Sequence, residues 1–128
     1  MSHPDVIAAV KARLAANWSE TVILGENATF ETPADLADWI SLSFPMATER
    51  QSDLGPHYRE LGGFQIAVGT QIGSGVDLSA DRCERLAALF RNQRFDGVEC
   101  RMAIKRGPGD DKSYQVATVT IAYEFAHD

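Results

Sequence analysis

The chain has 128 residues, of which 45% are hydrophobic and 23% charged, which is typical of one globular domain with one core. Its formal net charge of −6 argues against the basic surface that ordinary nucleic-acid binding needs, and it disfavours anionic membranes for the same reason. The first residues lack the basic start of a secretory signal, and no apolar run approaches membrane-spanning length, so we expect synthesis in the cytoplasm. Cys83 and Cys100 are too few for a disulfide framework and too isolated for a metal cluster, which predicts two buried thiols in a reducing compartment.

The first predicted element is a helix of about four turns. Ser2 with Asp5 three residues later is a carboxylate variant of the capping box, and Pro4 is tolerated in the first helical turn. The helix has one apolar stripe that must pack on another apolar surface, formed by Ile7, Val10, Leu14 and Trp18. Residues 19–38 show only fragments, with short strands at 21–24 and 28–30, a turn between them, and a break at Thr32-Pro33.

The middle of the chain has the two-residue period of half-buried strands. Residues 39–44 form the first strand, and Pro45 is predicted to end it. A second strand runs from about 57 to 69, and Gly62-Gly63 within it predicts a bulge or a close approach of another backbone. Residues 46–56 are polar and too many for a tight turn, which predicts a functional loop. The alternating apolar faces are Ile40, Leu42 and Phe44 on the first strand and Phe64, Ile66 and Val68 on the second.

The second half of the chain predicts a helix and a hairpin. The helix begins at Asp77 or Ser79, and its buried stripe consists of Cys83, Leu86, Ala87 and Phe90. After a turn at 94–97, the next strand has an apolar face made of Val98, Cys100, Met102 and Ile104. Residues 107–111 then turn the chain into a last strand, 114–125. That strand has about twelve residues against the usual five or six, so we expect the hairpin to project past the core.

These elements predict an α+β fold in one domain, residues 1–128, ordered helix, strands, helix, strands. Each helix has a single apolar face and the strands alternate, so two helices packed on one face of a mainly antiparallel sheet is the simplest arrangement. The other sheet face is polar enough for water or for a partner, with Arg101, Lys105, Thr118 and Thr120.

No residue pattern predicts catalysis, a cofactor or a metal. His57 could act as a base for Cys83 or a serine, but an exposed loop histidine is the simpler interpretation. The loop at 69–75 precedes a helix yet matches neither the Walker pattern nor the dinucleotide fingerprint. No His or Cys pair has ligand spacing, and turn chemistry explains Gly109-Asp110-Asp111. We therefore expect a protein that is not an enzyme.

Surface charges and one aromatic residue are the candidates for contacts with other proteins. The arginines around the second helix are most simply a solvated or salt-bridged face, with a subunit or DNA contact as the alternative. Trp39 would be a partner-binding anchor if it were exposed. The candidate interface residues are Trp39, Glu49, Arg50, Asp53, His57, Arg82, Arg85, Arg101, Lys105, Arg106, Asp110 and Asp111.

In the order of its elements and in the sequences of its strands, the chain resembles the tail terminator proteins of long, non-contractile-tailed phages. These are of the phage lambda type and include those of gene transfer agents. The likeness covers most of the chain, although 19–38 adds little to it. It is carried by Val6–Leu14, by Trp39–Phe44 with the polar residues after it, by Tyr58–Val68, by the glycine-rich loop before the second helix, and by Gln115–Ile121.

The resemblance implies a structural virion protein of the tail's neck region, assembled in the bacterial host. It implies a hexameric ring that caps the finished tail tube, stops tube polymerisation, and offers a docking surface to a head-side neck or stopper protein. Such a ring needs heterologous contacts that close, for which exposed strands and the loops 46–56 and 107–112 are candidates. The acidic charge suits a lumen through which DNA slides without sequence-specific binding.

Two alternatives remain at the level of the sequence. Another neck protein, such as a connector or head-completion subunit, would also form a ring but would lie at another level of the particle. A non-viral adaptor or small-ligand-binding domain would need an enclosed apolar pocket with converging polar groups, and the predicted apolar stripes contain no polar residues.

Overall fold

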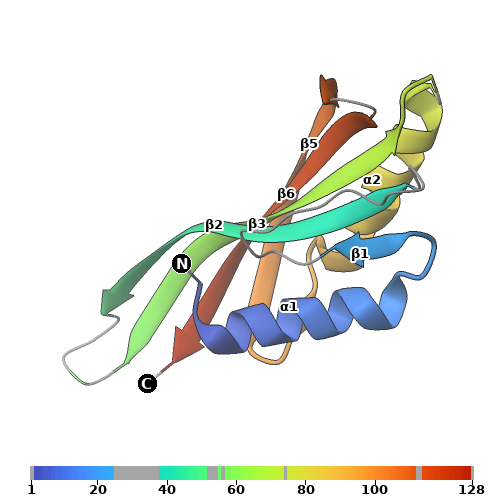
Figure 1. The fold of residues 1–128 in the computed structure, drawn as a ribbon. Helices are drawn as coiled ribbons and strands as arrows, with labels where there is room; N and C mark the ends of the chain where they lie inside the picture. Colours follow the sequence, from blue (N-terminus) through green and yellow to red (C-terminus); the bar gives the residue numbers. More distant parts are fainter. Residues whose placement is uncertain are drawn as a thin grey trace.

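A computed structural model of the chain describes residues 2–24, 38–51, 55, 57–73, 75–111 and 114–127, without the side chains of 108, 110 and 111. The described residues form two helices and six strands (Figure 1). The helices are α1 (Pro4–Asn17) and α2 (Val76–Phe90). The strands are β1 (Val22–Leu24), β2 (Trp39–Gln51), β3 (Tyr58–Gln71), β4 (Arg94–Phe95), β5 (Val98–Asp111) and β6 (Tyr114–His127).

The strands form one sheet in the order β1-β2-β3-β6-β5-β4. Only the short β1 runs parallel to its neighbour, and every other pairing is antiparallel. In Figure 1, the end of β2 and the start of β3 extend to the lower left, whereas the end of β5 and the start of β6 extend to the top. The predicted α+β fold with a mainly antiparallel sheet is confirmed, as is the strand predicted within 21–24. The strand predicted at 28–30, with the turn before it and the break at 32–33, lies outside the described residues.

One hydrophobic cluster contains buried side chains of both helices and of four strands. The buried side chains of α1 and α2 meet the inward residues of four strands: Val6, Val10 and Leu14 from α1, Leu86 and Phe90 from α2, and Ile40, Ile66, Ile121 and Cys100 from the sheet. Both cysteines are buried, as predicted, and burial raises the pKa of the Cys83 thiol and brings that of Cys100 to about 12. The predicted buried stripe of α2 is confirmed.

The predicted loop at 46–56 is wrong for most of its length. β2 continues to Gln51, paired with β3 in register from Met46 to Gln51. Pro45 does not end the strand but lies where the register shifts between Ser43 and Met46, because a bulge accommodates a residue that cannot donate to the ladder. β3 itself runs without interruption through Gly62.

Gly62 confirms the predicted close approach of another backbone. A Cβ at this position would lie 2.8 Å from the carbonyl oxygen of Met46 and 2.7 Å from the hydroxyl of Tyr123. Only glycine leaves room for both groups. The Tyr123 hydroxyl belongs to a buried chain of hydrogen bonds, in which it donates to Glu60 Oε2 and accepts from Ser2 Oγ, each at 2.7 Å. The backbone N–H of His3 also donates to the Glu60 carboxylate at 3.1 Å.

That hydrogen-bond chain changes the predicted start of the first helix. Ser2 is buried against Tyr123, and His3 caps α1 instead, with Nδ1 accepting from the backbone N–H of Asp5 at 3.1 Å. Burial and hydrogen bonding across the sheet therefore outweigh the local capping-box pattern.

The predicted alternation in β5 is wrong beyond Cys100. A register shift between Cys100 and Ala103 adds one residue and reverses which side chains face the helices. Met102 and Ile104 are therefore exposed, and Lys105 lies on the helix side, where it contacts Glu84 of α2. The turn predicted at 107–111 is also wrong, because β5 continues to Asp111 through a second register shift between 106 and 109.

Candidate functional site

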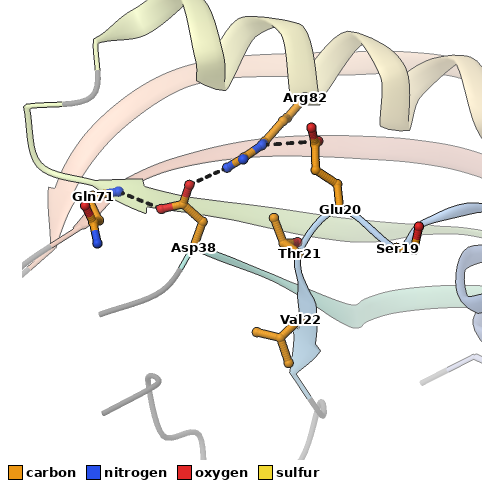
Figure 2. Close-up of a pocket in the computed structure, with 7 residues that line it drawn as sticks. All are labelled: Ser19, Glu20, Thr21, Val22, Asp38, Gln71 and Arg82. Atoms are coloured by element: carbon orange, nitrogen blue, oxygen red, sulfur yellow. Dashed lines mark hydrogen bonds and ion pairs between the residues drawn. The ribbon is translucent and has the colours of Figure 1, made fainter. Parts of the chain in front are cut away.

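An open pocket of about 580 Å³ lies where the end of α1, the start of β1 and the side of α2 meet (Figure 2). Its lining is mostly polar and consists of Ser19, Glu20, Thr21, Val22, Asp38, Gln71 and Arg82. Figure 2 shows Arg82 reaching from α2 between the carboxylates of Glu20 and Asp38. The pocket is thus organised by one cation between two anions.

Arg82 is held within the chain by both carboxylates. Its Nη1 lies 2.6 Å from Asp38 Oδ2 and its Nε 3.3 Å from Glu20 Oε2. Asp38 is oriented in turn, because the backbone N–H of Gln71 donates to its Oδ1 at 3.1 Å. The Arg82 side chain is only 10% exposed, so these bonds replace the water that burial removes. These bonds connect α2 with Glu20 and Asp38, which lie before and after β1, and through Asp38 with the end of β3.

Arg85 extends the same network toward solvent. Its Nη2 lies 2.5 Å from Glu20 Oε2 and 2.9 Å from Asp81 Oδ2, and its guanidinium lies over the Trp18 ring at 5.3 Å from the centroid. The salt-bridged interpretation of the arginine-rich helix therefore describes both residues. Both of the other arginines around this helix have ion pairs within the chain as well, Arg91 with Glu84 and Arg94 with Glu99.

The described residues that line the pocket form no catalytic arrangement. Its hydroxyl groups come from Ser19 and Thr21, and its lining contains no histidine that could act as a base for them. Cys83 is also no nucleophile of the kind considered, because it is 4% exposed and burial raises its pKa, whereas a reactive thiol needs the opposite. Within the described residues no group of three or more His, Cys, Asp or Glu side chains could hold a metal ion.

Trp39 does not meet the condition for an exposed partner-binding anchor, because it is only 3% exposed. Its ring lies on Gly69 and meets the Tyr114 ring edge-on, with the centroids 5.6 Å apart. Trp39 pairs with Gly69 in the ladder, one position from the buried pair Ile40 and Val68, so it faces away from the main core. Trp39 and Tyr114 thus form a second buried contact on the other sheet face.

The other candidate interface residues lie mainly on β2 and β5, toward opposite sides of the sheet. Glu49 and Arg50 are exposed on β2, with Glu49 Oε1 2.5 Å from His127 Nε2, and His57 is exposed just before β3. Arg101, Lys105 and Arg106 are exposed on β5. Asp110 and Asp111 belong to β5, but their side chains and all of Asp53 lie outside the described residues. The structure therefore does not bring all the candidates together at one place.

Arg101 belongs to a charged chain that crosses the sheet. It lies 3.0 Å from Glu124, which also contacts Arg59 at 3.4 Å, while Glu99 lies 3.0 Å from Arg94. The hydrogen bond from Arg94 lowers the pKa of Glu99, and the bond to Glu124 raises that of Arg101. These pairs are largely exposed, so they hold side chains in place more than they stabilise the fold.

The sequence pattern does not indicate the exposure of three apolar side chains, Met46, Met102 and Ile104. Met46 was placed in a polar loop, and the alternation in β5 placed Met102 and Ile104 on a buried face. They are 69%, 65% and 56% exposed, respectively. The consecutive residues Arg101 and Met102 lie at the bulge that turns Met102 and Ile104 outward, but the same sequence also fits a regular strand.

One of three comparisons with known proteins identifies a family. The family model described as phage tail terminator protein matches residues 5–123. One solved structure is 23% identical over 98% of this chain and 96% of its own, with a TM-score of 0.69, which supports the fold alone. No curated protein matches. No helix in the described part of the chain is long and apolar enough to cross a membrane. The chain belongs to the phage tail terminator family and is a structural component of the phage tail.

Proposed function

We propose that this protein forms a hexameric ring on the end of the finished tail tube, where it stops tube polymerisation and joins the tail to the head-side neck. The family match over residues 5–123 is the observation that carries this proposal.

The partners of such a ring are further copies of the chain, the tail tube protein and a head-side neck or stopper protein. DNA would pass through the lumen without sequence-specific binding, and the net charge of −6 favours free passage because it repels phosphates. We propose a particle of the lambda type or a related gene transfer agent, with the ring at the neck after assembly in the bacterial cytoplasm.

Another neck protein is the second candidate, since a connector or head-completion ring would use similar contacts at another level of the particle. The small-ligand-binding alternative is weaker. It needs an enclosed apolar pocket, whereas the pocket around Arg82 is open and lined mostly by polar groups, of which Arg82 already binds Glu20 and Asp38.

Deletion of the gene tests the proposal. Particles assembled without the protein should have tails of variable, uncontrolled length that do not join heads, and expression of the intact chain in trans should restore both properties. Tail lengths are measured in negative-stain electron micrographs. Tails of normal length without heads would support the neck alternative, and normal particles would refute both proposals.

A further inference from the structure

Among the residues that the structure describes, the large exposed apolar side chains fall into two groups. The first group lies on the sheet face opposite the helices, which we call the outer face, and consists of Met46, Met102 and Ile104. The second group lies at the end of the sheet where β1 and α2 begin, and consists of Val22, Ile72 and Val76. Apolar side chains that gather on a surface in this way mark contact sites.

One row of residues crosses the outer face between two methionines. Met46 pairs with Gly63, and Gly63 pairs with Ala122. Ala122 lies opposite the bulge that contains Met102, and it points away from the helices because the next residue, Ile121, is buried on their side. Three strand spacings of about 4.8 Å place the backbones of β2 and β5 about 14 Å apart. Only a glycine and an alanine lie between the two methionines, so an apolar side chain of a partner can contact both.

The outer face is basic although the chain is acidic. The charged side chains described there are five arginines and two glutamates: Arg50, Arg59, Arg94, Arg101, Arg106, Glu99 and Glu124. The chain as a whole has a net charge of −6. Both glutamates already bind arginines, whereas Arg50 is exposed and has no ion pair with another described residue. The excess of positive charge favours a partner with carboxylates, and it opposes contact between two outer faces.

The second apolar group lies among carboxylates. The start of β1 is level with the end of β3, because Val22 pairs with Trp39 and Trp39 pairs with Gly69. Ile72 directly follows β3, and Val76 is the first residue of α2. Figure 2 shows Val22 beside two of the carboxylates at one pocket. We call this region the acidic end, and its carboxylates belong to Glu20, Asp38, Asp77 and Asp81.

The acidic end has more negative than positive charge at its surface. Its two arginines bind three of its four carboxylates, and the Arg82 side chain is only 10% exposed. The fourth, Asp77, is exposed next to Val76 and has no ion pair with another described residue. The acidic end therefore combines exposed apolar side chains with negative charge, whereas the outer face combines them with positive charge.

We propose that the acidic end of one copy packs on the outer face of the next copy, with Ile72 between Met46 and Met102. Charge complementarity identifies the occupant as a second copy, because each surface meets its opposite on the same chain. The contact covers both groups of exposed apolar side chains. Since the two surfaces differ, the contact is heterologous, and contacts of this kind can close into a ring. The inference rests on the proposed function, because it supplies the subunit contact of that ring.

Cysteine cross-linking tests the contact. Ile72→Cys and Met102→Cys proteins are mixed and treated with a short bis-maleimide linker. The native thiols should not react, since Cys83 and Cys100 are 4% and 2% exposed. We expect covalent dimers only when the two variants are mixed, and a ladder of larger species from the double variant. Ala88→Cys, which is exposed on α2 outside both surfaces, is the matched control and should not link to Met102→Cys.

Substitutions test the two kinds of attraction separately. Ile72→Asn and Met102→Asn should each raise the protein concentration needed for ring assembly at least about tenfold, as expected for buried anchors, without changing the circular dichroism spectrum. Ala88→Asn should leave assembly unchanged. Arg50→Glu should also weaken assembly, whereas Lys11→Glu makes the same charge change on α1 and should not. Light scattering measures the assembled fraction.

The outcomes separate this inference from the proposed function. Linked dimers of a single variant alone would indicate like-to-like contact and overturn the inference. So would unchanged assembly of Ile72→Asn, or the absence of 72-to-102 links in assembled tails. In each of these cases a ring that still ends the tail tube leaves the proposed function standing. A wild-type chain that is monomeric both in solution and on finished tails would refute the inference and the ring together.

Discussion

Gly69 should be intolerant of a side chain because of one aromatic ring. An ideal Cβ there would lie 2.2 Å from Trp39 Cε2 and 2.5 Å from Cζ2, far inside ordinary contact. The ring is 3% exposed, so it cannot turn away into solvent without disturbing Tyr114. Overpacking of this kind costs about 1–3 kcal/mol. The lower entropy of the unfolded alanine chain offsets about 0.4–1 kcal/mol. We therefore expect Gly69→Ala to lower the free energy of unfolding by about 1–2 kcal/mol.

The double-mutant cycle with Trp39→Leu assigns that loss to the ring. Leucine lacks the atoms that clash, so Gly69→Ala should be neutral or stabilising in the Trp39→Leu background, giving a coupling free energy of about 1–3 kcal/mol. Urea unfolding followed by circular dichroism measures all four proteins. Gly63→Ala is the control in the same strand, because its Cβ would meet nothing closer than the Ile121 carbonyl at 3.4 Å. Equal losses for Gly69→Ala and Gly63→Ala, or additive effects in the cycle, would refute the reasoning.

Three further substitutions test the polar contacts. Arg82→Met should cost about 1–3 kcal/mol in urea unfolding, because it leaves Asp38 partly buried without its cation. Tyr123→Phe should cost about 1–3 kcal/mol, because the Glu60 carboxylate loses a buried donor. Lys105→Met should raise the pKa of Glu84, which hydrogen bonds from Lys105 and Arg91 hold at about 2, and a carbon-detected NMR titration measures the change.

The substitutions of Arg82 and Lys105 have matched controls. Arg85→Met, at a side chain that is 46% exposed, should cost less than Arg82→Met, and the reverse order would contradict the structural role of Arg82. Arg106→Met should leave the Glu84 titration unchanged. Since the folded-state pKa of Glu84 lies below its unfolded value, the interaction stabilises the fold above that unfolded pKa and is lost as the pH falls through about 2. A Glu84 titration unaffected by Lys105→Met would exclude the bond between them.

The sequence predicted the elements that have long, regular patterns. The stripe of α2 around Leu86 and the alternation near Ile66 are confirmed, because one face of each packs on a single core and nothing local competes. The starts of β2 at Trp39 and of β5 at Val98 were predicted correctly, but the ends of both strands were missed. Pro45 and the glycines around Pro108 are ordinary signals for a turn, yet pairing with β3 and β6 satisfies the backbone through bulges instead.

The candidate site was harder to predict than the core. Arg82 was identified, but its partners Glu20 and Asp38 are separated from it in sequence by 62 and 44 positions, so no local spacing indicates them. Trp39 was placed on the correct strand face, away from Ile40. Its burial depends on Gly69, which has no side chain and so leaves room for the ring, and on Tyr114. The exposure of Met102 and Ile104 depends on one bulge, whose position is decided by pairing with β6.

Ser2 and His3 bond to Tyr123 and Glu60, near the end of β6 and the start of β3, and this brings both ends of the chain close together. The His3 ring lies 4.7 Å from that of His127, and Figure 1 shows the two termini on the same side of the molecule. A gold particle or fluorophore joined to either terminus would thus mark the same end of β6. In a closed ring of rotated copies, all such markers would decorate a single rim. Labelled particles would then reveal the polarity of the ring, with one rim turned to the tube and the other to the head.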